Sequence, residues 1–177
     1  PFSNGRYSLI YNGEIYNFAE LRQELEKSGS KFRGGSDTEV MLAGFESWGI
    51  EATVARMAGM FAFALWDKQE RELWFFRDRL GEKPLFYGWI DGRLCFSSEL
   101  KSLRFCSRSG LAIDLRALGS YLQFGRMPGP LSVYQGIYKL PPGCLLRLGQ
   151  GSFHSIPGAF SPFAGEGTSG PKRYWDP

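Results

Sequence analysis

Three consecutive residues, Asn12, Gly13 and Glu14, carry groups that suit the binding of a small polar substrate. Asn12 supplies a side-chain amide donor, and Gly13 lacks a Cβ, so its backbone N–H can approach a ligand closely. Two such donors side by side are the components of an oxyanion hole. Glu14 adds a negative charge suited to an α-ammonium group. The alternative is a plain Asn-Gly turn followed by a solvated glutamate.

A second candidate lies in the run Gly34-Gly35-Ser36-Asp37. Two glycines before the start of a helix can present backbone N–H groups to an anion. Asp37 would either complement the helix dipole or join Glu14 in holding one ammonium group. The second role requires the two carboxylates to converge, which their spacing in the sequence leaves open.

A charged segment, residues 77–84, interrupts apolar strands and could hold a phosphate or nucleotide. It contains one glycine and no Gly-Lys-Ser/Thr, so it is not a P-loop. We therefore favour a structural ion-pair turn between strands for this segment.

Other catalytic chemistry is poorly supplied. The single histidine, His154, lies in a Gly/Ser/Pro-rich stretch and receives no role, which leaves no base for a Ser-His-Asp or Cys-His site. The cysteines, Cys95, Cys106 and Cys144, are odd in number and lack CxxC spacing, which argues against a disulfide framework and a zinc site. No metal site is expected, and a reducing compartment, hence a cytoplasmic location, fits best.

Composition indicates one globular domain. The 177 residues are 43% apolar and 22% charged, and the net charge of +3 is too small to indicate nucleic acid or membrane as a partner. No apolar run is long enough to span a bilayer, and the polar start is not a signal peptide. Because the chain lacks an initiator Met, we expect a processed product or a piece of a longer protein.

Both candidate groups would be positioned by the N-terminal elements. Residues 6–11 predict a strand that turns at Asn12-Gly13, and Asn17 with Glu20 has capping-box spacing for a following helix. Ser36 and Glu39 repeat that spacing at the start of a second helix. A shorter helix is predicted over residues 51–57.

The remaining pattern changes to strand periodicity. Residues 60–66 form an apolar run typical of a strand that is covered on both faces. Further strands are predicted over 73–76, over 85–90 and 93–96 around an Asp-Gly turn, and over 133–138 and 144–148. Ser98 and Asp114 could each cap a short helix. Strands without regular helix alternation, behind two leading helices, indicate an α+β fold.

Together these residues resemble a known family. The ordered series resembles the class II glutaminase domain of glutamine-hydrolysing asparagine synthetases over nearly the whole chain except roughly residues 150–171. The motifs that carry the resemblance are residues 12–17 (NGEIYN), 36–39 (SDTE), 59–67 (GMFAFALWD), 77–85 (RDRLGEKPL), 98–101 (SELK), 139–143 (KLPPG) and 173–176 (RYWD).

The resemblance implies a four-layer αββα N-terminal-nucleophile hydrolase fold. It also implies that an N-terminal cysteine attacks the side-chain amide of L-glutamine, with its own α-amine as base, to release ammonia through a thioester. Asn12 and the Gly13 N–H would stabilise the oxyanion, and Glu14 and Asp37 would hold the α-amino end. In the parent enzyme, a synthetase domain would use ATP, Mg²⁺ and aspartate. A homodimer is possible.

The chain departs from the family pattern in several ways. The Cys-Gly-Ile start and the substrate-carboxylate arginine are absent, none of the three cysteines is a chain terminus, and no Ser-Gly-Gly-x-Asp-Ser loop of a synthetase domain appears. We therefore expect an incomplete fold, lacking its first strands and the synthetase domain, and inactive alone. The expected divisions are a partial amidotransferase domain (1–148), a Gly/Ser/Pro-rich linker or insertion (149–172) and the start of a connection (173–177).

Two alternatives stay open at this point. The chain could be a glutamine-binding or scaffolding module that never had the nucleophile. It could also keep glutaminase chemistry but serve a different acceptor, such as a polysaccharide or antibiotic precursor.

Overall fold

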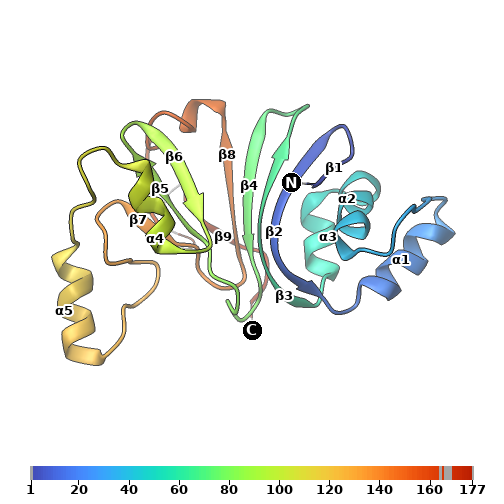
Figure 1. Ribbon diagram of the computed structural model, residues 1–177. Helices are drawn as coiled ribbons and strands as arrows, with labels where there is room; N and C mark the ends of the chain where they lie inside the picture. The colour runs from blue at the N-terminus through green and yellow to red at the C-terminus, as the bar shows by residue number, and fades with distance from the viewer. Residues whose placement is uncertain (1, 164, 166–168, 177) are drawn as a thin grey trace.

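The computed structural model describes residues 2–163, 165 and 169–176, and within them the chain forms two antiparallel sheets with helices outside them (Figure 1). The larger sheet has the order β1-β2-β3-β4-β8-β9 and the smaller one the order β6-β5-β7. This arrangement confirms the predicted α+β class.

The strands are β1 (Phe2–Ser3), β2 (Tyr7–Ile15), β3 (Gly59–Asp67), β4 (Glu72–Arg77), β5 (Phe86–Ile90), β6 (Arg93–Ser97), β7 (Ile137–Lys139), β8 (Cys144–Gly149) and β9 (Lys172–Arg173). The helices are α1 (Phe18–Lys27), α2 (Asp37–Ser47), α3 (Ile50–Arg56), α4 (Leu100–Leu103) and α5 (Leu115–Phe124), with 3₁₀ turns at η1 (Arg104–Cys106) and η2 (Gln150–Ser152).

The larger sheet has a core on each face. Helices α1–α3 pack on one face, where Phe45 of α2 meets Phe63 of β3, which in turn stacks on Phe76 of β4. The smaller sheet packs on the other face, where Phe75 meets Tyr87. Helix α4 lies against the smaller sheet. Figure 1 shows this succession from α1–α3, through the two sheets, to α4 and α5.

The apolar run over residues 60–66 is a strand buried on both faces, as predicted. Phe61 and Phe63 point into the core under α1–α3, whereas Ala62 and Ala64 point between the sheets. The small alanines therefore leave room for the second sheet on one face of β3, and the aromatic rings fill the space under the helices on the other.

Strand β2 corrects the prediction of a turn at Asn12-Gly13. It continues to Ile15, and Asn12 and Gly13 pair with Ala62 and Phe61 of β3. A nine-residue pairing partner keeps the chain extended through an Asn-Gly pair that would otherwise turn, because glycine tolerates the unusual φ of +153°.

The predicted capping box at Asn17 and Glu20 is also wrong. Asn17 precedes α1 but makes no side-chain cap; its amide instead donates to the Arg56 carbonyl and accepts from the Ala58 N–H. This side chain fastens the start of α1 to the segment before β3. These contacts with residues distant in the sequence replace the side-chain cap that the local sequence favours.

The capping box predicted for Ser36 and Glu39 at the start of α2 is half right. Ser36 caps the helix by accepting from the Glu39 N–H. The Glu39 carboxylate accepts from the N–H groups of Arg33 and Gly34 instead of returning to Ser36. It therefore stabilises the loop before the helix.

Later elements are largely as predicted. Asp91 and Gly92 form the turn between β5 and β6, and both have positive φ. Asp114 caps α5 by accepting from the Arg116 and Ala117 N–H groups. Two boundaries are wrong.

The residue before α4 is Glu99, and Ser98 lies one place further out. The strand predicted over 133–138 lies instead at Ile137–Lys139. Leu131 and Tyr134 make only isolated bridges, so pairing begins later than the apolar pattern indicates.

The charged segment 77–84 is structural, as favoured, but it is held by backbone contacts more than by an ion pair. The Arg77 guanidinium is buried and donates to the carbonyls of Lys83, Leu140 and Gly81. The buried Asp78 carboxylate accepts N–H groups from β3 and from its own loop. Both charges therefore organise this turn rather than a ligand.

Part of the segment predicted as a linker contacts the body of the molecule. Phe160 packs against Trp89, with ring centroids 5.2 Å apart, and the Trp89 indole donates to the Ser152 carbonyl. The boundaries at 148 and 172 stay predictions. Among the residues that the structure describes, no helix is both long and apolar enough to cross a membrane.

Asp67, at the end of β3, gives a prediction for pH dependence. Its buried carboxylate lies 2.6 Å from the Arg6 guanidinium and accepts N–H groups of Gln69 and Glu70. Burial alone would raise the pKa of Asp67, but these hydrogen bonds outweigh it and hold the pKa below its usual value. The stabilisation is therefore present above about pH 4 and is lost as the pH falls through the lower folded-state pKa.

We expect Asp67→Asn to lower the free energy of unfolding at pH 7, with the deficit shrinking as the pH falls below about 4. Urea unfolding of both proteins at a series of pH values measures this. A deficit that stays constant from pH 7 to acid would contradict the assignment.

Candidate active site

The Asn12–Glu14 triplet lies near the end of β2, and its side chains alternate between the two faces of the sheet. Tyr11 and Ile15 pack with the core under α1–α3. By the period of a strand, Asn12 and Glu14 point to the opposite face. Both are exposed, and the Asn12 amide lies 3.3 Å from the Ser98 hydroxyl.

The backbone of this triplet lies on a strand edge. Strand β1 pairs only with Ser8 and Leu9 in the described chain, so β2 continues beyond its partner. Tyr16 donates its N–H to the carbonyl of Ala58, the residue just before β3. Because N–H groups alternate along a strand, those of Gly13 and Ile15 point the other way, to the outer edge. The Gly13 N–H is therefore directed away from β3, as an oxyanion donor requires.

Asp37 approaches this same edge from the first turn of α2. Its Oδ2 atom accepts the Tyr11 hydroxyl at 2.7 Å and the Ile15 N–H at 3.2 Å, and its Oδ1 atom accepts the Thr38 N–H. Burial, followed by the hydrogen bond to Asp37, raises the pKa of Tyr11, so the phenol stays a donor. The structure thus brings Asp37 to the residues that flank the triplet.

The structure shows no such contact for the other predicted site residues, Glu14, Gly34 and Gly35. Glu14 is exposed and has no described hydrogen bond or ion pair with Asp37. Gly34 and Gly35 are exposed on the loop that precedes Ser36. Convergence of Glu14 and Asp37 on one ammonium group therefore stays a prediction.

A cavity of about 350 Å³ adjoins Asn12 between the two sheets. Its walls include Ala62 and Ala64 of β3 and Phe96 and Ser98 of the β6 region, but not Gly13, Glu14 or Asp37. Asn12 therefore lines this cavity, whereas Asp37 contacts Tyr11 and Ile15 outside it.

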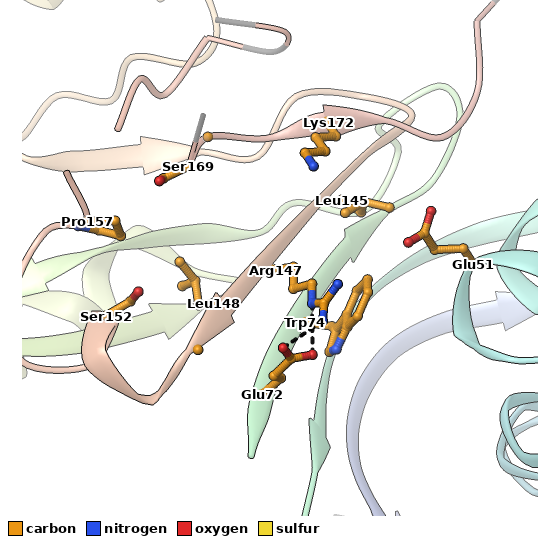
Figure 2. Close-up of a pocket in the computed structure, with 12 residues that line it drawn as sticks. Glu51, Glu72, Trp74, Leu145, Arg147, Leu148, Ser152, Pro157, Ser169 and Lys172 are labelled. Atoms are coloured by element: carbon orange, nitrogen blue, oxygen red, sulfur yellow. Dashed lines mark hydrogen bonds and ion pairs between the residues drawn. The ribbon is translucent and has the colours of Figure 1, made fainter. Parts of the chain in front are cut away.

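A second hollow lies elsewhere, over β4 and β8 (Figure 2). Its clearest polar contact is the ion pair between Arg147 and Glu72, 2.7 Å apart, with the Arg147 guanidinium over the Trp74 ring. None of the four candidate residues lines it. We do not assign the candidate chemistry to this hollow.

Gly13 has a structural reason to be glycine besides any role in binding. A Cβ at this position would lie 2.2 Å from the Met60 carbonyl oxygen, and the same holds for Gly59 against the Glu14 carbonyl. The two glycines therefore permit a close approach of β2 and β3 at the point where the triplet lies.

The cysteines are poorly suited to act as the nucleophile. Cys144 is buried, and its burial raises the pKa to about 11. Burial, followed by a hydrogen bond with Cys106, raises the pKa of Cys95 to about 11 as well. Within the described residues, no group of three or more His, Cys, Asp or Glu side chains could hold a metal ion.

Sequence reasoning missed two residues of this region. Tyr11 orients Asp37, and its only sequence signal is a polar-tipped aromatic residue next to the triplet in the same strand. Ser98 contacts Asn12 from 86 positions away. It lies in a recognised motif, but no local pattern links it to Asn12.

The fold is that of a class II glutamine amidotransferase. The structure superposes on glutamine phosphoribosylpyrophosphate amidotransferase from B. subtilis with a TM-score of 0.59 at 21% identity, over 88% of this chain and 31% of that chain. A second solved structure, an allosteric regulatory enzyme of purine biosynthesis, has the same TM-score at 22% identity, over 88% of this chain and 30% of that chain. At these identities the likeness concerns the fold alone.

Sequence comparison places the chain in a family. It belongs to the glutamine amidotransferase domain family, whose model matches residues 1–157. It is 41% identical over 142 residues to asparagine synthetase [glutamine-hydrolyzing] 1 of Bacillus subtilis, covering 80% of this chain and 22% of that protein. It is 42% identical over 152 residues to a putative asparagine synthetase of Mycobacterium tuberculosis, covering 84% and 23%. The chain thus spans less than a quarter of these relatives.

Proposed function

We propose that this chain is the glutaminase part of an asparagine synthetase. In the parent protein it would hydrolyse L-glutamine to glutamate and ammonia, and a synthetase domain would use the ammonia, with ATP and Mg²⁺, to amidate aspartate. The proposal includes the four-layer αββα N-terminal-nucleophile arrangement. Family membership and the identity to asparagine synthetases support it.

The observation that carries the proposal is the distance between Asp37 and the Gly13 N–H along the outer edge of β2. Asp37 binds the Ile15 N–H, and the Gly13 N–H emerges two residues away on the same edge, about 7 Å along the strand. An extended glutamine separates its α-nitrogen from its side-chain carbonyl by about 5 Å. One substrate could therefore contact Asp37 at one end and the Asn12-Gly13 donors at the other.

The chemistry follows from these contacts. A nucleophile attacks the side-chain carbonyl carbon, and the carbonyl oxygen becomes an oxyanion that accepts from the Asn12 amide and the Gly13 N–H. Collapse of this intermediate releases ammonia and leaves an acyl group on the nucleophile, which water then frees as glutamate. Asp37, assisted by Glu14, holds the α-ammonium. By the resemblance, the nucleophile is an N-terminal cysteine of the mature enzyme.

Asp37→Asn in the parent protein tests the proposal. It keeps the size of the side chain but removes the charge that faces the ammonium. We expect the KM for glutamine to rise roughly 10- to 100-fold, because a hydrogen bond to a charged group contributes about 1.5–3 kcal/mol. Steady-state glutaminase kinetics measure this, and synthesis from added ammonia should survive.

Tyr11→Phe is the matched control. It removes a hydrogen bond from Asp37 but leaves the carboxylate charge in place. We expect a much smaller rise in KM. Equal effects of the two substitutions would show that Asp37 acts only by fastening α2 to β2, and an unchanged KM in Asp37→Asn would overturn the assignment.

A further inference from the structure

A hollow of about 660 Å³ lies beside the turn at residues 77–84, and none of the four candidate site residues lines it. Among the described residues of its wall, three are basic and none is acidic: Arg77, Lys139 and Arg173. The rest of the wall consists of apolar side chains and glycines. We call it the basic hollow. A wall that carries one sign of charge attracts ligands of the opposite sign.

Lys139 of β7 carries the least compensated of these charges. Its side chain is half-buried, and its ammonium lies 5.9 Å from the centre of the Phe86 ring. Burial, followed by the positive charge of Arg77, lowers the pKa of Lys139, and no described acid forms an ion pair with it. Both causes disfavour the charged form. The ammonium therefore costs stability where it lies, unless an anion joins it.

Arg77 supplies a second positive charge, which is fixed in place. Its guanidinium is buried, and its hydrogen bonds to the carbonyls of Lys83, Leu140 and Gly81 hold the turn. Carbonyl acceptors satisfy N–H groups but carry no net charge. The hydrogen bonds of Arg77 therefore serve the turn, whereas its charge still acts on Lys139.

Arg173 of β9 is the third cation. Its described ion pair is with Asp176, and both side chains are largely exposed. An exposed pair of this kind is weak, so Arg173 can turn to a ligand. Burial raises the pKa of Cys144, and the positive charges of Arg173 and Arg77 oppose that rise. Both guanidinium groups therefore lie near the start of β8.

We propose that the basic hollow binds a phosphate-bearing ligand, whose oxygens accept from Lys139 and Arg173 within the field of Arg77. Two neighbouring cations are best matched by an anion of about two charges, which a phosphate group carries at pH 7 and a single carboxylate does not. The volume and the mostly apolar wall are those of a small-molecule site. This inference does not rest on the proposed function.

Hydrogen exchange in the parent protein tests the inference, with inorganic phosphate, pyrophosphate and AMP as separate probes. We expect a probe that binds to slow exchange over residues 137–145, whereas chloride at equal ionic strength should not. The smallest probe that gives this protection defines the ligand: a phosphate group alone, a pyrophosphate or a nucleotide. Because the readout comes from these residues, phosphate binding elsewhere in the parent protein does not obscure it. Protection by none of the three would overturn the proposal.

Lys139→Gln should weaken the affinity read from this protection at least about tenfold, because a hydrogen bond to a charged group is lost. Arg173→Gln should weaken it roughly two- to fivefold, since Arg173 is more exposed. Lys172→Gln is the matched control, because Lys172 precedes Arg173 but lines the hollow over β4 and β8 instead. Protection that survives Lys139→Gln, or that falls equally in Lys172→Gln, would contradict the assignment.

Thermal unfolding separates a binding role of Lys139 from a structural one. Without a ligand, Lys139→Gln should have a Tm equal to or above that of the unsubstituted protein, because burial and Arg77 both disfavour the ammonium. The probe that binds should raise the Tm of the unsubstituted protein more than that of the variant. Lys139→Met takes its place should Lys139→Gln not fold. A Tm lowered in both variants without ligand would show that Lys139 is structural and would overturn the proposal.

Discussion

Asn12→Ala is expected to lower kcat for glutamine hydrolysis by the parent protein roughly 10²- to 10³-fold, the usual cost of losing one oxyanion donor. The KM for glutamine should change much less, because the amide contacts the substrate most strongly when the carbonyl oxygen carries charge. Synthesis from added ammonia should be unaffected. Steady-state kinetics with glutamine and with ammonia separate these expectations.

Ser98→Ala is the control for this substitution. The only described hydrogen bond of the Asn12 side chain is to the Ser98 hydroxyl, at 3.3 Å. If Asn12 served only to join β2 to the segment after β6, removing either partner would have the same effect. We expect Ser98→Ala to retain most of its activity. A kcat in Asn12→Ala that matches that of Ser98→Ala would count against an oxyanion role.

Of the substitutions proposed for this chain, Gly13→Ala is expected to lower the free energy of unfolding most. The new Cβ would lie 2.2 Å from the Met60 carbonyl oxygen and 2.6 Å from the Phe61 Cα, and these backbone atoms of β3 cannot move without breaking the pairing. The φ of +153° adds strain for an L-residue. We expect a loss of about 3 kcal/mol or more, and a fall in Tm of roughly 6–12 °C.

Gly119→Ala provides the matched control for that experiment. Gly119 lies inside α5, and a Cβ there would meet no atom within 4 Å. We expect this substitution to be neutral or to stabilise the protein by about 0.5–1 kcal/mol, as in an exposed helix. Thermal unfolding of the two variants measures the difference. A Gly13→Ala protein as stable as the unsubstituted one would show that β2 and β3 are not in close contact at Gly13.

Hydrophobic periodicity predicted the helices and strands of the core well, because these elements form where apolar side chains can be buried. The apolar run over residues 60–66 lies in β3, and the predicted Asp-Gly turn joins β5 to β6. Local signals failed where a distant partner competed for the same group. Asn17 has the right spacing for a capping box, but its amide binds the Arg56 carbonyl and the Ala58 N–H.

The candidate site shows the same division. Residue chemistry and the family resemblance singled out Asn12, Gly13, Glu14 and Asp37 from the sequence. The sequence could not show that Asp37 meets the Ile15 N–H, because that contact depends on how α2 is packed against β2. Nor could it reveal Tyr11 as the side chain that orients Asp37, or the close approach that requires glycine at position 13.

A structure of the parent protein with its product glutamate bound would test the central claim most directly. We predict that the α-nitrogen of glutamate lies within hydrogen-bonding distance of the Asp37 carboxylate. Its δ-carboxylate should accept from the Asn12 amide and the Gly13 N–H on the outer edge of β2. Glutamate bound elsewhere, such as in the hollow over β4 and β8, with Asp37 still closed on Tyr11 and Ile15, would contradict the proposal.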